Sequence, residues 1–226
     1  MKKLLTILAI ASAATFSYAQ GTVILQNGAA AFFVSTNAAA LGQGIGVTAK
    51  TALGFDYAVL TAAYGGPVPS TSPLDGAWTG AILTGNNFTI AAGGIAGQGG
   101  PAGAPAAGWG APTAGQYSDG TERYFMIVGW SSNLGTTWAN VSANMASNWA
   151  TPWGANQAFF GTSAIGFGYS GGGPLSLPAT SLYSVTGGMP GGLSSGFQLM
   201  AIVPEPSTIA LAAFGGLSLL LFRRRK

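Results

Sequence analysis

Few side chains in this sequence could do chemistry. The chain has no histidine and no cysteine, which removes the usual general base near neutral pH, the thiol nucleophile and the commonest ligands of transition metals. The middle of the chain offers four dispersed carboxylates: Asp56, Asp75, Asp119 and Glu122. A glycosidase needs two carboxylates at a defined separation across a sugar, but Arg123, directly after Glu122, indicates an exposed turn there. We therefore predict that the protein is not an enzyme and needs no cofactor or metal.

Tryptophan is the other residue type with a possible binding role, because an exposed indole can stack on a sugar ring. The chain has six tryptophans, and most aromatic residues of a β domain belong to its core. Trp109 lies in a tract rich in glycine, alanine and proline, and Trp153 follows Pro152. We expect these two tryptophans to be the exposed pair that could contact a glycan. Their burial would instead favour a structural role for the domain.

Charge is scarce, and most of the basic residues lie at the two ends of the chain. Only 6% of the residues are charged, against roughly 25% in an ordinary soluble domain. Between the ends, Lys50 and Arg123 stand against the four carboxylates, a balance of −2. A surface that binds nucleic acid needs several cations to neutralise several phosphates. We therefore expect no nucleic-acid partner, despite a sequence pI near 9.3.

The N-terminus has the three parts of a secretion signal. Two lysines precede an apolar run over residues 4–14, and the small residues Ser17 and Ala19 stand just before the expected cut. This order is typical of a signal peptide that is removed after export. The alternative, a permanent membrane anchor, needs a longer apolar run. We predict a signal helix over residues 1–19, cleavage between Ala19 and Gln20, and the secretion translocon and signal peptidase as partners.

The C-terminus has a similar order of parts in reverse. Pro204, Glu205 and Pro206 precede an uncharged stretch over residues 207–222. As a helix this stretch would be about 24 Å long, a little short of the roughly 30 Å core of a bilayer. Four cations end the chain: Arg223, Arg224, Arg225 and Lys226. Because such clusters stay on the cytoplasmic side, the segment predicts a transmembrane helix with the bulk of the protein outside.

Residues 203–226 resemble the PEP-CTERM sorting domain of proteins exported by Gram-negative bacteria, which also has a Pro-Glu-Pro motif, a short apolar helix and a terminal arginine cluster. The resemblance implies an exosortase as partner, cleavage near Pro204, Glu205 and Pro206, and a path from an inner-membrane precursor to the cell surface, outer membrane or extracellular matrix. It also implies an association with exopolysaccharide. The alternative is a permanent tail anchor, for which the membrane physics is the same.

The segment between the two ends is long enough for one domain, residues 20–202. Glycine, proline, asparagine and serine interrupt short apolar or alternating stretches, which predicts an all-β fold, an antiparallel sandwich or a jelly-roll-like single domain. The most apolar run, residues 124–130, predicts a central strand buried on both faces. The candidate strands are residues 22–26, 31–35, 54–63, 78–84, 87–91, 123–130, 164–169, 181–186 and 196–203.

Two segments break the pattern of short strands. Trp138, Val141, Met145 and Trp149 have helical spacing, which predicts one short helix, capped at its start by a threonine at position 136 or 137. Residues 92–115 form a glycine-, alanine- and proline-rich tract that predicts a flexible surface loop.

These observations favour a non-enzymatic cell-surface or extracellular-matrix protein that is sorted, and processed, at its PEP-CTERM-like tail. The alternative is a carbohydrate-binding module associated with exopolysaccharide, with a polysaccharide as its partner. The position of Trp109 and Trp153 distinguishes the two hypotheses.

Overall fold

The computed structural model describes most of the segment between the two termini. The described residues are 20–27, 30–37, 46–47, 54–87, 93–110, 122–149, 157–172, 177–184 and 188–202. The expected signal helix and transmembrane helix lie outside these ranges. Within them, no helix combines the length and the apolar character that crossing a membrane requires.

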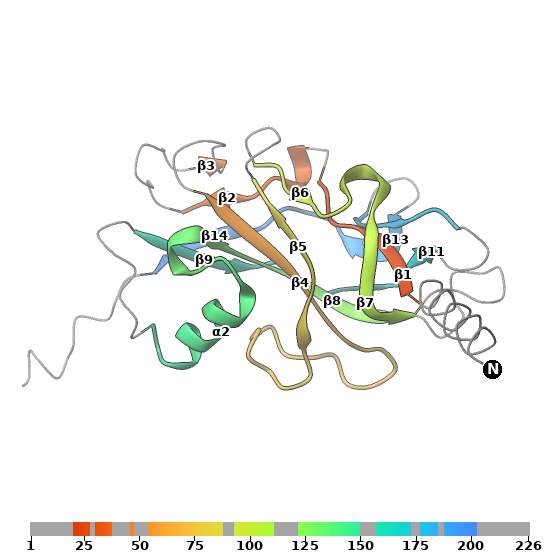
Figure 1. Ribbon diagram of the computed structural model, residues 1–226, viewed down its shortest axis with the longest axis horizontal. Helices are drawn as coiled ribbons and strands as arrows, with labels where there is room; N and C mark the ends of the chain where they lie inside the picture. Colours follow the sequence, from red (N-terminus) through yellow and green to blue (C-terminus); the bar gives the residue numbers. More distant parts are fainter. Residues whose placement is uncertain are drawn as a thin grey trace, which may run out of the picture.

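Fourteen strands form one curled sheet, with a single α-helix among the described residues (Figure 1). The strands are β1 (Gln20–Ile24), β2 (Ser35–Thr36), β3 (Gly46–Val47), β4 (Phe55–Ala63), β5 (Thr79–Asn86), β6 (Ala96–Gly97), β7 (Ala104–Gly110), β8 (Arg123–Ser131), β9 (Ala158–Thr162), β10 (Gly166–Gly168), β11 (Gly171–Gly172), β12 (Thr180–Tyr183), β13 (Gly188–Leu193) and β14 (Gln198–Ile202). The helices are η1 (Ala30–Phe32), η2 (Gly100–Ala102), η3 (Ser132–Leu134) and α2 (Trp138–Ala146).

The centre of the sheet is the antiparallel pair β4–β8. The two strands stay in register over their full length, from Phe55 opposite Ser131 to Ala63 opposite Arg123. Both are almost entirely buried, as the apolar run of residues 124–130 predicted for β8. Gly129 permits this close packing, because a Cβ there would lie 2.8 Å from the Tyr57 ring.

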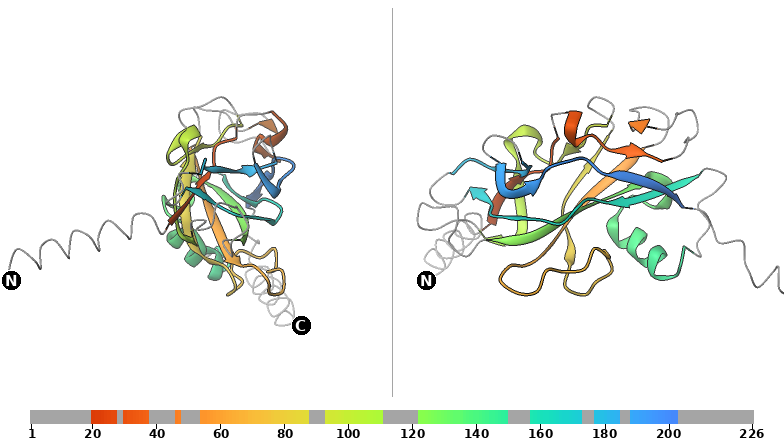
Figure 2. Two further views of the ribbon diagram at one scale, coloured as in Figure 1. Left: turned by 90° about the vertical axis from the view of Figure 1, so that its right-hand side faces the viewer. Right: turned by 180° about the vertical axis from the view of Figure 1, so that it is seen from behind.

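Side chains of β4 and β8 alternate between two cores, because successive residues of a strand point to opposite faces. Phe55, Tyr57 and Ile127 face the inner core, which the curled sheet encloses between its two layers (Figure 2). Leu60 and Val128 face the outer core, which α2 and Trp78 cover. One strand pair therefore holds both halves of the hydrophobic interior together.

The other edge of β8 divides between two strands. Residues Val128–Trp130 pair with β9, and the start of β8 pairs with β10. Ser163 lies between β9 and β10, where its amide donates to the Ile127 carbonyl (2.8 Å) and its hydroxyl accepts from the Ile127 amide (2.9 Å). A serine side chain thus completes the ladder where the strand splits.

Other buried polar side chains also complete backbone hydrogen bonds where neighbouring strands do not pair. The Asn27 amide group donates to the carbonyls of Phe32 and Gly93, and its oxygen accepts from the Ile95 amide. The Asn87 oxygen accepts from the Phe55 amide (3.0 Å), and the Ser131 hydroxyl accepts from the Phe159 amide (2.8 Å). Because an unpaired buried backbone group is costly, these uncharged side chains allow the sheet to curl without loss of hydrogen bonds.

The predicted helix is confirmed. α2 begins at Trp138, and the Thr137 hydroxyl accepts from the Asn140 amide (3.4 Å) as its N-cap. Trp138 and Val141 pack into the outer core, as their spacing indicated. The helix ends at Ala146, and Trp149 follows it with a positive φ of 58°.

The all-β class is confirmed, but the arrangement of strands differs from the prediction. The sheet is not purely antiparallel, because β1 pairs with β12, β12 with β13, and β14 with β2 in parallel. One continuous curled sheet makes both layers, in place of the separate sheets of a sandwich or jelly roll. The cause is that strands from the start of the chain join strands from its end, a pairing that local sequence patterns do not contain.

Two local predictions need correction. The tract over residues 92–115 is not a loop where the structure describes it, because residues 93–110 contain β6, η2 and β7. Buried and exposed residues alternate in the first half of β7, and this strand pairs with β1. Residues 31–35, expected to be a strand, instead end η1 and lead into β2, and most of the candidate strand at 87–91 lies outside the described residues.

Replacing Ser163 with alanine should lower the free energy of unfolding by about 1–3 kcal/mol, because the buried Ile127 amide would lose its acceptor. Urea unfolding of residues 20–202, followed by tryptophan fluorescence, measures the change. Ser142→Ala is the matched control, since that hydroxyl donates to the Ala139 carbonyl on the exposed side of α2, and it should change stability by no more than about 0.5 kcal/mol. Equal effects of the two substitutions would contradict the role of Ser163.

Candidate functional site

A row of neighbouring residues crosses four strands on the outer face of the sheet. Trp130 of β8 lies opposite Asp56 of β4, Asp56 lies opposite Asn86 of β5, and Asn86 lies opposite Ala96 of β6. The register of the sheet therefore places a carboxylate and an amide side by side. Thr84 lies two residues before Asn86 on the same face of β5, since alternate residues share a face.

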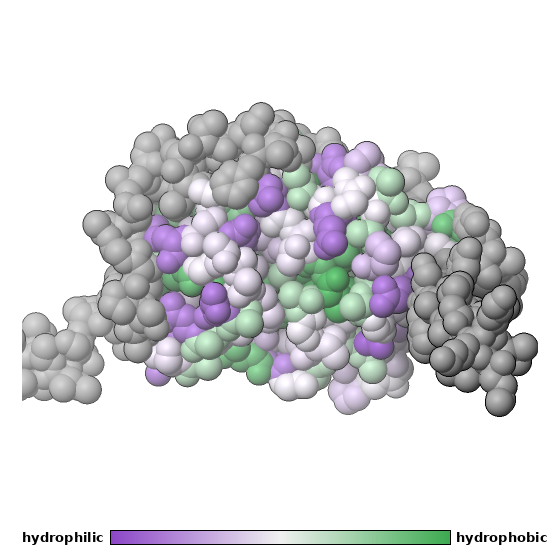
Figure 3. Space-filling model, viewed as in Figure 1, coloured by the Kyte–Doolittle hydropathy of each residue, from purple (hydrophilic) through white to green (hydrophobic). Residues whose placement is uncertain are grey.

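This row forms part of the wall of a groove with a volume of about 600 Å³, within the range of small-molecule sites. One rim is the segment that leads into α2, with Thr136 and Thr137, and the opposite rim includes Gln98 after β6. The full lining comprises Asp56, Tyr57, Thr84, Gly85, Asn86, Ala96, Gly97, Gln98, Trp130, Thr136 and Thr137. The face that carries α2 and β5 shows purple, white and green residues interspersed, without a broad green area among its described residues (Figure 3).

Asp56 gives the groove its charge. Its side chain is half-buried, and the Ser132 hydroxyl donates to its Oδ2 at 2.7 Å. Burial removes water from the carboxylate and raises the pKa of Asp56 above its ordinary value of 3.8, while the hydrogen bond from Ser132 partly opposes this shift. The Ser132 contact also fixes the orientation of the carboxylate, because Ser132 begins η3 directly after β8.

The groove has side chains that can bind a polar ligand. Among the described residues, Asp56 is the only carboxylate in the lining, and none of these residues is a cation. The amides of Asn86 and Gln98 and the threonine hydroxyls each donate and accept hydrogen bonds. Within the described ranges, no group of three or more acidic residues could hold a metal ion.

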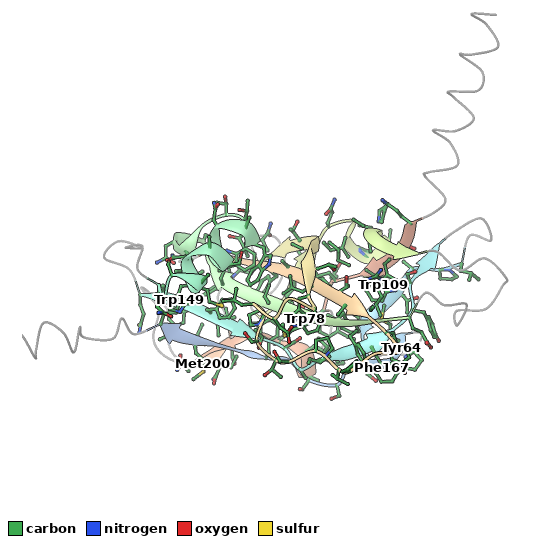
Figure 4. All side chains as sticks on the ribbon, turned by 90° about the horizontal axis from the view of Figure 1, so that it is seen from below. Tyr64, Trp78, Trp109, Trp149, Phe167 and Met200 are labelled. Carbon is green, nitrogen blue, oxygen red and sulfur yellow. The ribbon has the colours of Figure 1, made fainter. Side chains whose placement is uncertain are left out.

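The structure does not support the expected exposure of Trp109. β7 pairs with β1, and this pairing buries the Trp109 side chain completely, with its ring 6.1 Å from that of Phe125 (Figure 4). Trp109 is therefore a core residue and does not face a glycan. Trp153 lies outside the described residues.

The remaining predicted sites lie mainly at the ends. Gln20 begins β1 with an exposed side chain, whereas Ala19, the Pro204–Pro206 motif and the C-terminal cations lie outside the described residues. Of the four carboxylates, Asp119 is also outside, and Asp75 is exposed in the segment before β5. There its carboxylate accepts from the amides of Ser70 (3.0 Å) and Ala77 (2.9 Å), which lowers the pKa of Asp75.

Sequence reasoning missed the aromatic residues that do reach the surface. Tyr64 and Phe167 are 42% and 40% exposed and stack at 5.6 Å, and Tyr64 also contacts Tyr124 at 5.0 Å. They come from the turn after β4, from β10 and from the start of β8, and lie away from the groove at the opposite end of the domain from Met200 (Figure 4). No spacing rule joins residues from three separate elements, so the sequence held no signal for this aromatic cluster.

The described domain ends at Ile202 with β14, and the chain continues into its apolar, basic tail. Residues 203–226 match the family model of the PEP-CTERM protein-sorting motif. The chain is therefore a PEP-CTERM domain-containing protein.

This match implies exosortase-dependent sorting of an exported protein, with an exosortase as the processing partner. It covers the tail alone and leaves the role of the folded domain open. Neither the curated proteins nor the solved structures contain a match to the chain.

The raised pKa of Asp56 makes a prediction about stability. Because the folded state binds the Asp56 proton more tightly than the unfolded state does, this carboxyl lowers stability as the pH rises through the window above 3.8. Asp56→Asn keeps an acceptor for Ser132 and should raise the free energy of unfolding at pH 7, by no more than about 1 kcal/mol for a half-exposed group. Urea unfolding at pH 7 and pH 3 should show this gain at pH 7 alone. A loss of stability at pH 7 would mean that the charge is compensated.

Proposed function

We propose that this protein is a non-enzymatic component of the cell surface or extracellular matrix, delivered by its PEP-CTERM tail. The observation that carries the proposal is the sorting motif at residues 203–226, which begins one residue after the last strand of the domain. In this proposal the folded β domain is the cargo, and the tail serves only to deliver it. The groove is consistent with this proposal, since its lining among the described residues has one carboxylate and no second acid or base to pair with it.

The proposed route follows from the two ends. Residues 1–19 direct the chain to the secretion translocon, and signal peptidase cuts after Ala19, so that the domain begins at Gln20. The apolar segment over residues 207–222 then holds the precursor in the inner membrane, with the four terminal cations in the cytoplasm. The exosortase cuts near Pro204–Pro206, and the domain proceeds to the cell surface, outer membrane or matrix.

Replacement of Pro204, Glu205 and Pro206 by alanine tests this route. The substitution leaves the apolar segment and the four terminal cations unchanged, so a purely physical anchor should behave as before. A processing enzyme should lose its recognition of an extended, proline-restricted segment beside the membrane. We expect the triple-alanine variant to accumulate in the inner membrane with its tail intact, while the wild type appears at the cell surface as a shorter chain that begins at Gln20.

Intact mass spectrometry of the inner-membrane, outer-membrane and medium fractions of the native host distinguishes these outcomes. Pro67→Ala combined with Val68→Ala is the control, because it changes a proline and its neighbour in an exposed segment of the domain and should leave mass and location as in the wild type. If the triple-alanine variant and the wild type have the same mass and location, the tail is a permanent anchor.

A carbohydrate-binding module is the second candidate function, and the groove is the observation that favours it. The groove replaces the Trp109–Trp153 pair as the candidate contact surface. Its amides, hydroxyls and one carboxylate would suit the many hydroxyl groups of a neutral saccharide, and the absence of a cation from its lining disfavours phosphates and acidic sugars.

Substitutions in the groove test this second function. Asn86→Ala and Gln98→Ala should each weaken the binding of a neutral oligosaccharide roughly 2- to 10-fold, as expected for the loss of one hydrogen bond. A glycan array of neutral and acidic oligosaccharides identifies the probe, and isothermal titration calorimetry measures its affinity. Gln198→Ala, an exposed glutamine on β14, is the matched control. Absence of binding to every neutral oligosaccharide, or equal effects of all three variants, would reject the groove as a saccharide site.

A further inference from the structure

An apolar patch lies at the end of the domain where β14 finishes. We define the tail-side patch as Trp149, Phe160, Met200 and Ile202. Met200 is 52% exposed, and the other three side chains are partly exposed. Met200 lies opposite Phe160 in the β14–β9 pair, and the Trp149 ring is 5.6 Å from that of Phe160. Figure 4 shows Trp149 and Met200 at the same end of the domain, and Figures 1 and 2 show α2 and the end of β14 there as well.

The elements around this patch are uncharged. No charged residue occurs in α2, β9 or β14. Within the described ranges the charged residues are Asp56, Asp75, Glu122 and Arg123. The last two lie at the start of β8, where that strand pairs with β10. The described part of this end could therefore approach an apolar phase without the cost of removing water from a charge.

The connection from the domain to the apolar part of the tail is short. Seven residues lead from Ile202, the last residue of β14, to Ile209. Even a fully extended chain of this length spans at most about 25 Å. If the tail lies in the bilayer, the end of β14 is confined close to the membrane surface.

We propose that the tail-side patch of the membrane-held precursor rests on the lipid surface of the bilayer, with Met200 and Trp149 in the interfacial region. The inference rests on the proposed function, because it requires the tail to lie in the membrane. Tryptophan favours this interface, where its ring meets the apolar region and its N–H meets water. The contact holds residues 203–206 at the membrane surface, where a membrane enzyme must reach them.

The aromatic cluster of Tyr64, Tyr124 and Phe167 provides a matched comparison. It is similarly exposed, but it lies at the opposite end of the domain (Figure 4), and Arg123 immediately precedes Tyr124. A short tether brings the tail-side patch to the membrane and holds this cluster away from it.

Single cysteines test the inference, since the chain has none of its own. Met200→Cys and Phe167→Cys are each introduced into the full-length triple-alanine variant, which keeps the tail whichever way processing turns out. The proteins are purified from the inner membrane, labelled with a polarity-sensitive fluorophore and reconstituted in vesicles of inner-membrane lipid that contain nitroxide-labelled phosphatidylcholine. We expect a blue shift and a loss of fluorescence for the label at position 200, and neither change for the label at position 167.

Equal fluorescence of the two labels, in proteins that keep the tryptophan emission of the unsubstituted chain and resist extraction by alkaline carbonate, would overturn this inference alone. So would a label at position 200 that is shielded from an aqueous quencher but is not quenched by the lipid nitroxide, because another protein would then cover the patch. Release of the full chain by alkaline carbonate would overturn both the inference and the membrane-held precursor of the proposed function. Equal mass of wild type and triple-alanine variant would overturn processing and leave the patch to be decided by the fluorescence.

Discussion

The ladder between β4 and β8 is the interaction on which the rest of the structure depends. Its nine residue pairs place Phe55, Tyr57 and Ile127 in the inner core and Leu60 and Val128 in the outer core. The sheet extends from this pair through β5 on one side and through β9 and β10 on the other, and α2 packs against the outer core. The close approach of Tyr57 and Gly129 shows how tightly the pair is built, since no side chain larger than hydrogen fits at that position.

Neutral polar side chains take the place of charged ones in the interior of this domain. Where the sheet curls or splits, buried serine and asparagine side chains complete the backbone hydrogen bonds, as Ser163 does for Ile127 and Asn87 does for Phe55. These neutral groups cost less to bury than charged ones. The described charged residues lie outside these buried positions, as Asp56 does in the groove.

The outer face of the sheet brings the two candidate surfaces close to each other. Trp138 of α2 packs on Trp130 and Phe160 (ring centroids 6.1 and 6.3 Å), so the helix covers the middle of a row that runs from Asp56 to Met200. The polar groove lies on one side of the helix and the tail-side patch on the other. If this patch rests on the membrane, the groove lies on the other side of α2 from the point of attachment. Cleavage within the exosortase-dependent tail removes none of the residues that line the groove.

The sequence by itself determined the sorting tail, the all-β class, the central strands β4 and β8 and the helix α2, because each depends on residues close together in the chain. It missed β7 and β13, whose glycine and alanine residues have little strand propensity of their own. It also missed β6, β9 and β11. Only the tertiary structure decided which distant segments pair, such as Val23 with Thr180, and thereby which side chains are covered. Trp109 is buried because β7 pairs with β1, and Asp56 meets Asn86 because of the register between β4 and β5. Burial and site geometry are properties of these long-range pairings, and no local pattern encodes them.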